Sequence, residues 1–263
     1  MAQDPDGARM AGGRTGGAVR RGDAVHRPVR PWTPAVHQLL RYLEGVGFDG
    51  APRVLGFDDQ GQEVLSYLDG DTVGDDLPWP SWVHSDTALT EVGAWLRRLH
   101  DVTSQFRPPD GLVWFAGQRW HPGLVHGHHD AAPYNAVWRD GGLVGFVDWD
   151  TAGPSSRELD LAFTALAWVP LLIPKMVEPQ GFTAFGDRSR RLHLLLDAYG
   201  YTGDRLAFGA EVASRARVNA AGIRRLAAGG DPTYVALLPV AVDFEAAARQ
   251  VEALPRSFWL GGR

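Results

Sequence analysis

The side chains whose types and spacing could support catalysis lie within residues 125–150. Asp130 and Asn135 stand five residues apart on a loop that contains a proline, and two short apolar runs around an Asp-Gly-Gly turn follow them. Such runs predict a β-hairpin, which would return Asp148 to the side of Asn135. Two carboxylates and an amide would then converge. This set suits an oxygen-ligated Mg²⁺ together with a base for a hydroxyl.

The surrounding sequence predicts the elements that must position these side chains. Ahead of the stretch, strand-like runs and turns flank one amphipathic segment, which predicts a small five-stranded sheet with one helix over residues 12–69. Behind it, helical patterns dominate and are separated by glycine, proline and capping residues. We expect strands near 24–27, 52–57 and 63–68, and helices near 33–45, 86–100, 158–168, 188–199, 204–228 and 232–253.

Composition limits the functional classes that remain. The 263 residues are 44% hydrophobic, so the chain can bury a sizeable core. The net charge of −5 argues against a nucleic-acid partner that depends on overall basicity. The absence of cysteine excludes disulfides and thiolate metal sites. No apolar run is long enough to span a membrane, and the N-terminal residues lack a signal-peptide core. We therefore expect a cytoplasmic protein without nucleic-acid or membrane partners.

The stretch resembles the catalytic core of kinase-like phosphotransferases. In that core the pattern HxDxxxxN precedes a hairpin that ends in aspartate, and here His128-His129-Asp130, Asn135 and Asp148 match it. The run Val147-Asp148-Trp149-Asp150 is similar to the I-D-W-x form found in the aminoglycoside phosphotransferase and choline kinase superfamily. The resemblance extends from about Gly12 to the final helices.

The resemblance implies an α+β, protein-kinase-like fold with two lobes. A small β-rich, nucleotide-binding N-lobe would cover residues 12–69. A larger helical C-lobe for catalysis and substrate binding would cover residues 70–263. Residues 1–11 are small and polar without periodicity, and we expect them to be disordered.

The same resemblance implies roles for the residues of the core. Asp130 would orient the acceptor hydroxyl and accept its proton, and Asn135 and Asp148 would hold Mg²⁺. Asp150 and His129 are candidates for contact with substrate or metal. His128 would brace the loop, and Asp160, in a D-L-A run on a predicted helix, would steady the catalytic-loop backbone.

The predicted N-lobe would bind ATP or GTP as co-substrate. Gly16 and Gly17 end a glycine-rich turn whose backbone amides could approach phosphates. By the resemblance, Ser66, Tyr67 and Leu68 form the hinge whose backbone would hold the nucleotide base.

The sequence departs from the family pattern at two residues, the strand lysine that binds the nucleotide phosphates and the helix glutamate that pairs with it. The family usually has a strand lysine there, but the one lysine in the chain is Lys175, far downstream. Arg27 is the best replacement, since arginine can bind phosphate bidentately, although a surface strand arginine is an equal alternative. Val36-His37 stands about where the helix glutamate that pairs with that lysine is expected. The ion pair is therefore absent or rebuilt.

The predicted function is ATP- or GTP-dependent transfer of a γ-phosphoryl group to a hydroxyl of a small molecule, either an antibiotic or a metabolite. Polycationic aminoglycosides need an acidic pocket. Residues 151–263, which would bind the acceptor, carry 13 basic and 11 acidic residues. A small hydroxylated molecule therefore ranks above an aminoglycoside.

A rival interpretation is a metal-dependent hydrolase. His126, His128 and Asp130 resemble an HxHxD run that could hold Zn²⁺. Ala131 stands where that motif requires a further histidine, and His193 is the one histidine that follows.

A third interpretation is a catalytically weak, kinase-like immunity or binding protein. The run Ala-Trp-Val-Pro-Leu at 167–171 and the helix end Asp-Ala-Tyr-Gly at 197–200 are similar to the trifolitoxin-immunity-like branch of the superfamily. The absent strand lysine leaves this interpretation open.

Overall fold

The computed structural model describes residues 17–261. Gly16 and the N-terminal segment 1–11 therefore lie outside the described residues. The described chain folds into two compact units, which are treated separately here. The first unit contains the chain up to Asp75 together with Leu99–Asp130 and Tyr134–Ser155, and the second contains Asp76–Arg98, Ala131–Pro133 and the chain from Ser156. The lobe boundary at residues 69 and 70 stays a prediction.

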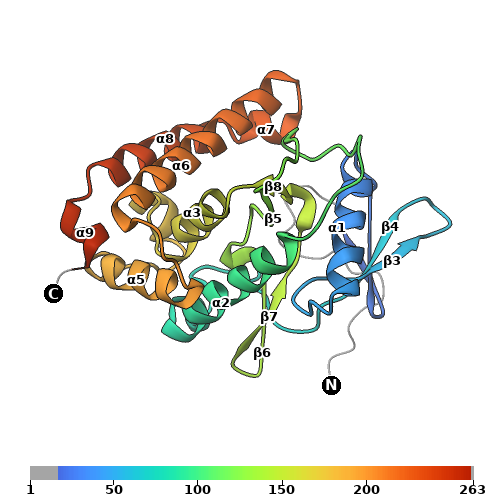
Figure 1. Cartoon of the computed structure of the whole chain (residues 1–263), viewed down its shortest axis with the longest axis horizontal. Coiled ribbons are helices and arrows are strands. Elements are labelled where there is room, and N and C mark those ends of the chain that lie inside the picture. The colour runs from blue at the N-terminus through green and yellow to red at the C-terminus, as the bar shows by residue number, and fades with distance from the viewer. Residues whose placement is uncertain (1–16, 262–263) are drawn as a thin grey trace. The chain divides into compact units, whose positions relative to one another are not determined.

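The first unit contains a four-stranded antiparallel sheet with strand order β1-β2-β4-β3. Its strands are β1 (Val19–Arg21), β2 (Ala24–Arg27), β3 (Val54–Phe57) and β4 (Glu63–Ser66), and the last two are labelled in Figure 1. The expected fifth strand is not found among residues 17–69. In the β2–β4 register Arg27 lies opposite Glu63, so two charged side chains share one end of the sheet.

One amphipathic helix, α1 (Thr33–Gly45), accompanies this sheet in the first unit. Its buried residues recur at helical spacing, as the sequence predicted, and they include His37 as well as apolar side chains. The buried apolar residues are Ala35, Val36, Leu39, Leu40 and Leu43. The helix thus carries a histidine into the interior of the unit.

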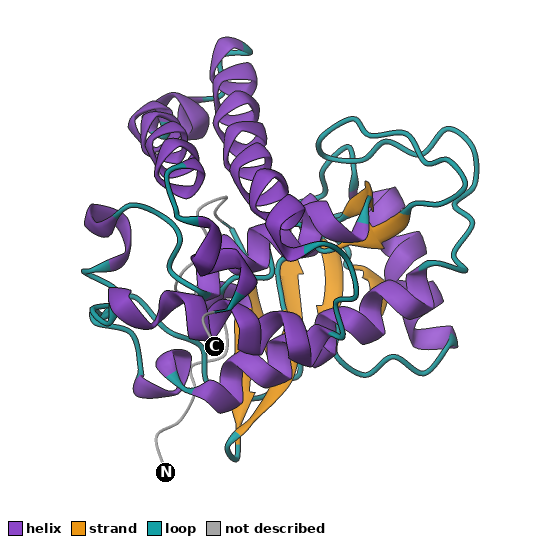
Figure 2. Ribbon diagram, turned by 60° about the vertical axis from the view of Figure 1, so that its left-hand side comes forward, coloured by secondary structure: helices purple, strands orange, loops and turns teal. Residues whose placement is uncertain are grey.

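Two short β-ladders complete the first unit. Strand β5 (Val125–Gly127) pairs antiparallel with β8 (Gly153–Ser155), and β6 (Ala136–Arg139) pairs with β7 (Gly142–Phe146). The predicted hairpin is confirmed, and its turn residues Asp140 and Gly141 both have positive φ, as a type I′ turn requires. Every strand of residues 17–261, orange in Figure 2, belongs to this unit.

The second unit is helical in its described part. It holds most of α2 (Asp86–Thr103), then α3 (Arg157–Trp168), α5 (Arg188–Tyr199) and α6 (Arg205–Ala228). Short helices α4 (Pro174–Val177), α7 (Pro232–Ala236) and α9 (Arg256–Leu260) and the longer α8 (Leu238–Glu252) complete it. Ser156, Asp204 and Asp231 cap the helices that follow them through side-chain hydrogen bonds.

The single helix predicted over residues 232–253 is wrong. The chain forms α7 and then α8, which meet at Leu237, and a proline stands in the first turn of α8. Proline has no N–H to donate inside a helix but is well suited to a first turn, so Pro239 ends one helix and starts another. None of the helices in the described part of the chain is long and apolar enough to cross a membrane.

Candidate active site

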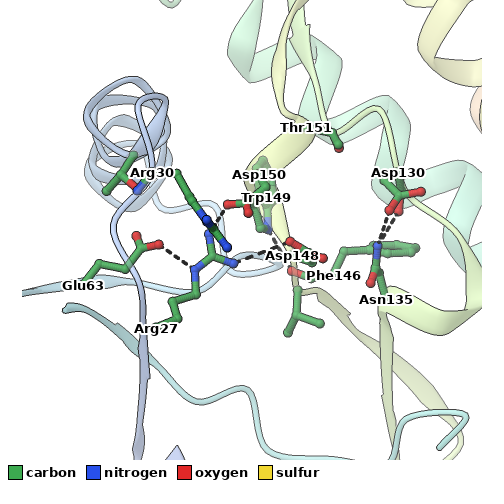
Figure 3. Close-up of polar contacts among 12 residues, drawn as sticks. Arg27, Arg30, Glu63, Asp130, Asn135, Phe146, Asp148, Trp149, Asp150 and Thr151 are labelled. Carbon is green, nitrogen blue, oxygen red and sulfur yellow. Dashed lines mark hydrogen bonds and ion pairs between the residues drawn. The ribbon is translucent and has the colours of Figure 1, made fainter. Parts of the chain in front are cut away.

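The β6–β7 hairpin brings Asn135 and Asp148 together. Asn135 ends the 3₁₀ turn that precedes β6, and its carbonyl accepts a hydrogen bond from Val147 N at 2.9 Å. Asp148 follows Val147 directly, and Ala136 pairs with Phe146 in the ladder. Asn135 and Asp148 therefore lie at the same end of the hairpin (Figure 3).

Asp130 is held by two hydrogen-bond donors. Tyr134 Oη donates to Oδ1 at 2.5 Å, and Asn135 Nδ2 donates to Oδ2 at 2.9 Å. Asn135 Nδ2 also donates to the Asp130 carbonyl at 2.9 Å. Figure 3 shows the amide nitrogen of Asn135 turned towards Asp130. These bonds fix the Asp130 carboxylate. Because the Asn135 amide nitrogen already donates to Asp130, Oδ1 is the Asn135 side-chain atom suited to bind a metal.

His128 braces the loop that carries Asp130. Its Nδ1 accepts a hydrogen bond from Asp130 N at 3.3 Å, so the neutral ring carries its proton on Nε2, which lies 3.0 Å from the Val147 carbonyl. Thr151 Oγ1 donates to the His128 carbonyl at 2.9 Å. One side chain thus ties the catalytic loop to the residue before Asp148.

His129 and Asp148 both adopt left-handed backbone conformations, with φ of 65° and 58°. The left-handed region is uncommon for residues other than glycine, and such residues are enriched at functional sites, where the backbone conformation orients a side chain. His129 is 4% exposed, and its Nε2 lies 3.1 Å from the Gly153 carbonyl. That contact joins the loop to β8. A role for His129 towards substrate or metal stays a prediction.

Arg27 contacts three carboxylates. Its Nε donates to Glu63 Oε1 at 2.6 Å, Nη1 lies 3.5 Å from Asp148 Oδ1, and Nη2 donates to Asp150 Oδ1 (Figure 3). The Arg27 side chain is only 15% exposed, so the alternative of a surface strand arginine does not hold. Burial disfavours its charge, but Asp150, Glu63 and Asp148 outweigh that effect and raise the Arg27 pKa.

Glu63 and His37 complete this network, and neither was predicted as a site residue. Glu63 is fully buried, and its Oε2 lies 2.8 Å from Nε2 of the buried His37. Burial acts to raise the Glu63 pKa, but the hydrogen bond from His37 and the charge of Arg27 outweigh it, so the pKa is lowered. The ion pair is therefore rebuilt: a strand glutamate replaces the helix glutamate, and the helix contributes His37.

The sequence contains one signal for Glu63. A charged residue opens an otherwise apolar strand, Glu63-Val64-Leu65, and such a residue is buried only when it is paired. The register that places Glu63 opposite Arg27 comes from pairing between strands 36 residues apart. Local patterns do not contain that information.

Asp148 and Asp150 form an acidic pair. Burial, and then the like charge of Asp150, raise the Asp148 pKa, while Arg27 partly offsets both. A further cation at Asp148 would relieve this repulsion. The Asp148 carboxylate and Asn135 Oδ1 are hard oxygen donors, the ligand type that Mg²⁺ prefers. The residues present therefore fit a magnesium ion.

The two histidines of the HxHxD run have different surroundings. His126 lies buried between the rings of Phe106 and Trp114, with centroids 4.8 and 5.1 Å away. Burial, with His129 and Arg107 nearby, lowers the pKa of His126 to about 3. Both ring nitrogens of His128 are engaged in the loop. Within residues 17–261 no three histidine, cysteine, aspartate or glutamate side chains form a metal-binding group.

The predicted nucleotide-binding residues have mixed environments. Gly17 has φ of 107°, and a side chain there would lie 3.2 Å from Pro28, so glycine fits this turn. Ser66 N donates to the Arg53 carbonyl and Tyr67 N to the Asp23 carbonyl, each at 2.8 Å. The backbone N–H groups of Ser66 and Tyr67 therefore already donate hydrogen bonds within the first unit. The hinge role of residues 66–68 stays a prediction.

Asp160 belongs to the second unit. It lies in the first turn of α3 and is completely buried. Its burial agrees with a structural role, and its action on the catalytic loop stays a prediction.

Comparisons with known proteins agree with this geometry. The sequence profile of the "Phosphotransferase enzyme family" matches residues 114–194. The trifolitoxin immunity protein of Rhizobium leguminosarum bv. trifolii is 40% identical over 194 residues, which cover 72% of each chain.

Two solved structures show the same fold. A choline/ethanolamine kinase family protein from Mesorhizobium loti has a TM-score of 0.59 at 17% identity, covering 98% of this chain and 92% of its own. An amicoumacin kinase in complex with AMP-PNP, Ca²⁺ and Ami has a TM-score of 0.62 at 12% identity, covering 96% of this chain and 90% of its own. The chain therefore belongs to the aminoglycoside phosphotransferase and choline kinase-like superfamily, with a protein-kinase-like fold and with the trifolitoxin immunity protein among its relatives.

Proposed function

We propose that the protein transfers the γ-phosphoryl group of ATP or GTP to a hydroxyl of a small molecule. The observation that carries this proposal is the convergence of Asp130, Asn135 and Asp148 beside a buried arginine. A metal-nucleotide complex needs cations and oxygen ligands at one end and an acceptor-side carboxylate at the other. The first unit supplies each of these groups.

Asp130 acts at the acceptor end. With its carboxylate fixed by Tyr134 and Asn135, it orients the acceptor hydroxyl and receives its proton as transfer proceeds. Phosphoryl transfer has a loose transition state, so deprotonation is late and orientation is the larger part of this role.

Asn135 and Asp148 act at the nucleotide end. They would hold Mg²⁺, which would offset the charge of the phosphates. Asp150 holds Arg27 in place through Oδ1 and stays a candidate for contact with metal or substrate. The left-handed backbone conformation of Asp148 sets the direction of its side chain at the end of the hairpin.

Arg27 takes the place of the missing strand lysine. Its guanidinium lies between the metal-binding end of the hairpin, at Asp148, and the buried Glu63. A fork of N–H donors can bind two phosphate oxygens together. Glu63 accepts a hydrogen bond from Arg27, and His37 contacts the other oxygen of Glu63. Together they would position the arginine, as the helix glutamate positions the lysine in the family pattern.

The acceptor is a small hydroxylated molecule, either a metabolite or an antibiotic. The near-neutral balance of residues 151–263 gives no general attraction for a polycation, so an aminoglycoside is not favoured. Nucleoside triphosphates are cytoplasmic substrates, and we place the protein there, with no nucleic-acid or membrane partner.

A second candidate function is immunity without phosphoryl transfer. It is favoured by one observation, the 40% identity to a protein named for trifolitoxin immunity. In that case the kinase-like site would bind a ligand but not transfer phosphate. Protection by Asp130→Asn as strong as that by the native chain, in cells exposed to a toxin, would favour this candidate.

The test of the proposed function is phosphoryl transfer to a panel of hydroxylated metabolites and antibiotics. The purified protein is incubated with Mg²⁺ and either ATP or GTP, and a phosphorylated product is identified by mass spectrometry. We expect at least one acceptor to gain a phosphate with the native chain and not with Asp130→Asn. If wild-type protein binds neither nucleotide, the proposal is wrong.

A further inference from the structure

The hydroxyl of Tyr134 contacts Asp130, the residue proposed above to act on the acceptor. Its Oη donates to Asp130 Oδ1 at 2.5 Å, the oxygen that Asn135 does not hold. This is the contact expected of an acceptor hydroxyl whose proton will pass to the carboxylate. Tyr134 therefore presents an alcohol oxygen where the proposed reaction needs one.

The surroundings of Tyr134 are compatible with chemistry at its oxygen. The residue is 44% exposed, so its ring is not fixed in the core. Tyr134 and Asp130 are four residues apart and belong to the same unit as Asn135 and Asp148. An acceptor tied to the catalytic loop needs no binding step and has the orientational advantage of an intramolecular group.

We propose that Tyr134 is a self-phosphorylation site. This inference rests on the proposed function and adds a second acceptor to it, a side chain of the protein itself. The bond between the γ-phosphorus and the β,γ-bridging oxygen of a nucleoside triphosphate breaks, and a bond from that phosphorus to Tyr134 Oη forms. The tyrosine proton passes to Asp130, and the nucleoside diphosphate leaves.

The geometry also limits the extent of the reaction. Tyr134 brings one hydroxyl to Asp130, so each chain can add one phosphate at this place. The phosphate replaces the donated proton with negative charge beside the carboxylate, and like charges at this distance repel. Phosphorylation of Tyr134 thus closes the site to external acceptors and limits the activity of each chain.

The test uses the full-length protein with Mg²⁺ and ATP and no external acceptor. Intact mass spectrometry counts phosphates per chain, and fragmentation of peptides locates them. We expect one phosphate, on Tyr134, formed at a rate that does not change with protein concentration because the transfer is intramolecular. The phosphate should be absent from Tyr134→Phe and from Asp130→Asn, and it should remain in Tyr201→Phe, a control in the second unit.

A second measurement does not depend on catalysis. In nucleotide-free protein, tetranitromethane should nitrate Tyr134 faster in Asp130→Asn than in the native chain, because the reagent attacks the phenolate and the hydrogen bond to the Asp130 carboxylate disfavours that form. Thermal unfolding of each variant confirms that it folds. Equal nitration of Tyr134 in the two proteins, phosphate on another residue, or a label that persists in Tyr134→Phe would each overturn the inference.

Failure of this inference is distinct from failure of the proposed function. A protein that phosphorylates an external acceptor but never Tyr134 would overturn self-phosphorylation and leave the proposed function standing. A protein that binds no nucleotide would overturn both.

Discussion

Arg27 makes contacts that a lysine could not reproduce. Its three guanidinium nitrogens each face a different carboxylate, those of Glu63, Asp148 and Asp150. A lysine ammonium is one point charge on a flexible stem, whereas the guanidinium is a planar fork with fixed donor directions. The site therefore keeps the positive charge of the family pattern and changes the residues that hold it.

Glu63→Gln should destabilise the fold and weaken nucleotide binding. The substitution preserves shape but removes the charge that offsets buried Arg27. We expect the free energy of unfolding at neutral pH to fall by roughly 1–3 kcal/mol, the range for leaving a buried polar group poorly paired. Urea unfolding and calorimetric titration with Mg²⁺-nucleotide measure the two effects. Glu44→Gln, at an exposed ion pair with Arg53, is the matched control and should change little.

The same pair of proteins should differ in pH dependence. The folded-state pKa of Glu63 lies below its ordinary value, so its ionised form stabilises the fold above the unfolded-state pKa. That contribution is lost as the pH falls through the folded-state pKa. Native protein should therefore lose stability on acidification below about pH 4.5, and Glu63→Gln should lose less. Parallel acid curves for the two proteins would contradict a charged Glu63.

Asp130→Asn should separate catalysis from binding. Size and shape are preserved, and nucleotide affinity should remain close to that of the native chain. Turnover on an identified acceptor should fall by roughly 10²–10⁴-fold, the range for a positioned acid–base group. Steady-state kinetics and calorimetry provide the two numbers. Full turnover by this variant would remove Asp130 from its proposed role.

At the scale of elements, the β6–β7 hairpin sets the geometry of the site. Asn135 precedes its first strand and Asp148 follows its second, so any shift in register would separate them. The hairpin is fixed to the rest of its unit by close backbone contact, since Phe146 N donates to the Gly50 carbonyl at 3.2 Å. A β-carbon on Gly145 would lie 2.4 Å from that same carbonyl oxygen.

Gly145→Ala should therefore damage the fold and the site together. The added methyl group meets backbone that cannot move aside, and overpacking of this kind costs about 1–3 kcal/mol. We expect a lower melting temperature and weaker Mg²⁺-dependent nucleotide binding. Gly222→Ala, in α6 with no atom within 4 Å of the added carbon, should instead be neutral or stabilising by about 0.5–1 kcal/mol. Equal stability of the two variants would show that the contact at Gly50 is not tight.

What could be predicted from the sequence was local. The hairpin follows from a short turn between apolar runs, and α1 from spacing within one helix. The partnership of Arg27 with Glu63 and His37 could not be predicted in that way, because it depends on strand register and on the packing of distant segments. The break between α7 and α8 at Leu237 was not predicted because an apolar pattern continues across Pro239. A proline at that position is nevertheless typical of the first turn of a new helix.

At the scale of the whole molecule, one unit contains nearly all of the predicted chemistry. Arg27, Glu63, Asp130, Asn135 and the hairpin belong to the first unit, whereas Asp160 and the loop residues 131–133 belong to the second. Residues 114–194 match the phosphotransferase enzyme family, and a 40% identical relative is named for trifolitoxin immunity. The central claim is therefore that this chain binds a nucleotide through Mg²⁺.

Calorimetric titration of the full-length protein with ATP and GTP tests that claim most directly. The titration is made with Mg²⁺, with excess chelator, and with Asp148→Asn in the presence of Mg²⁺. We predict saturable binding of at least one nucleotide by the native chain with Mg²⁺, and a loss of affinity of at least about tenfold both with chelator and in Asp148→Asn, equivalent to about 1.4 kcal/mol. No binding under any condition, or equal affinity in all three, would contradict the account.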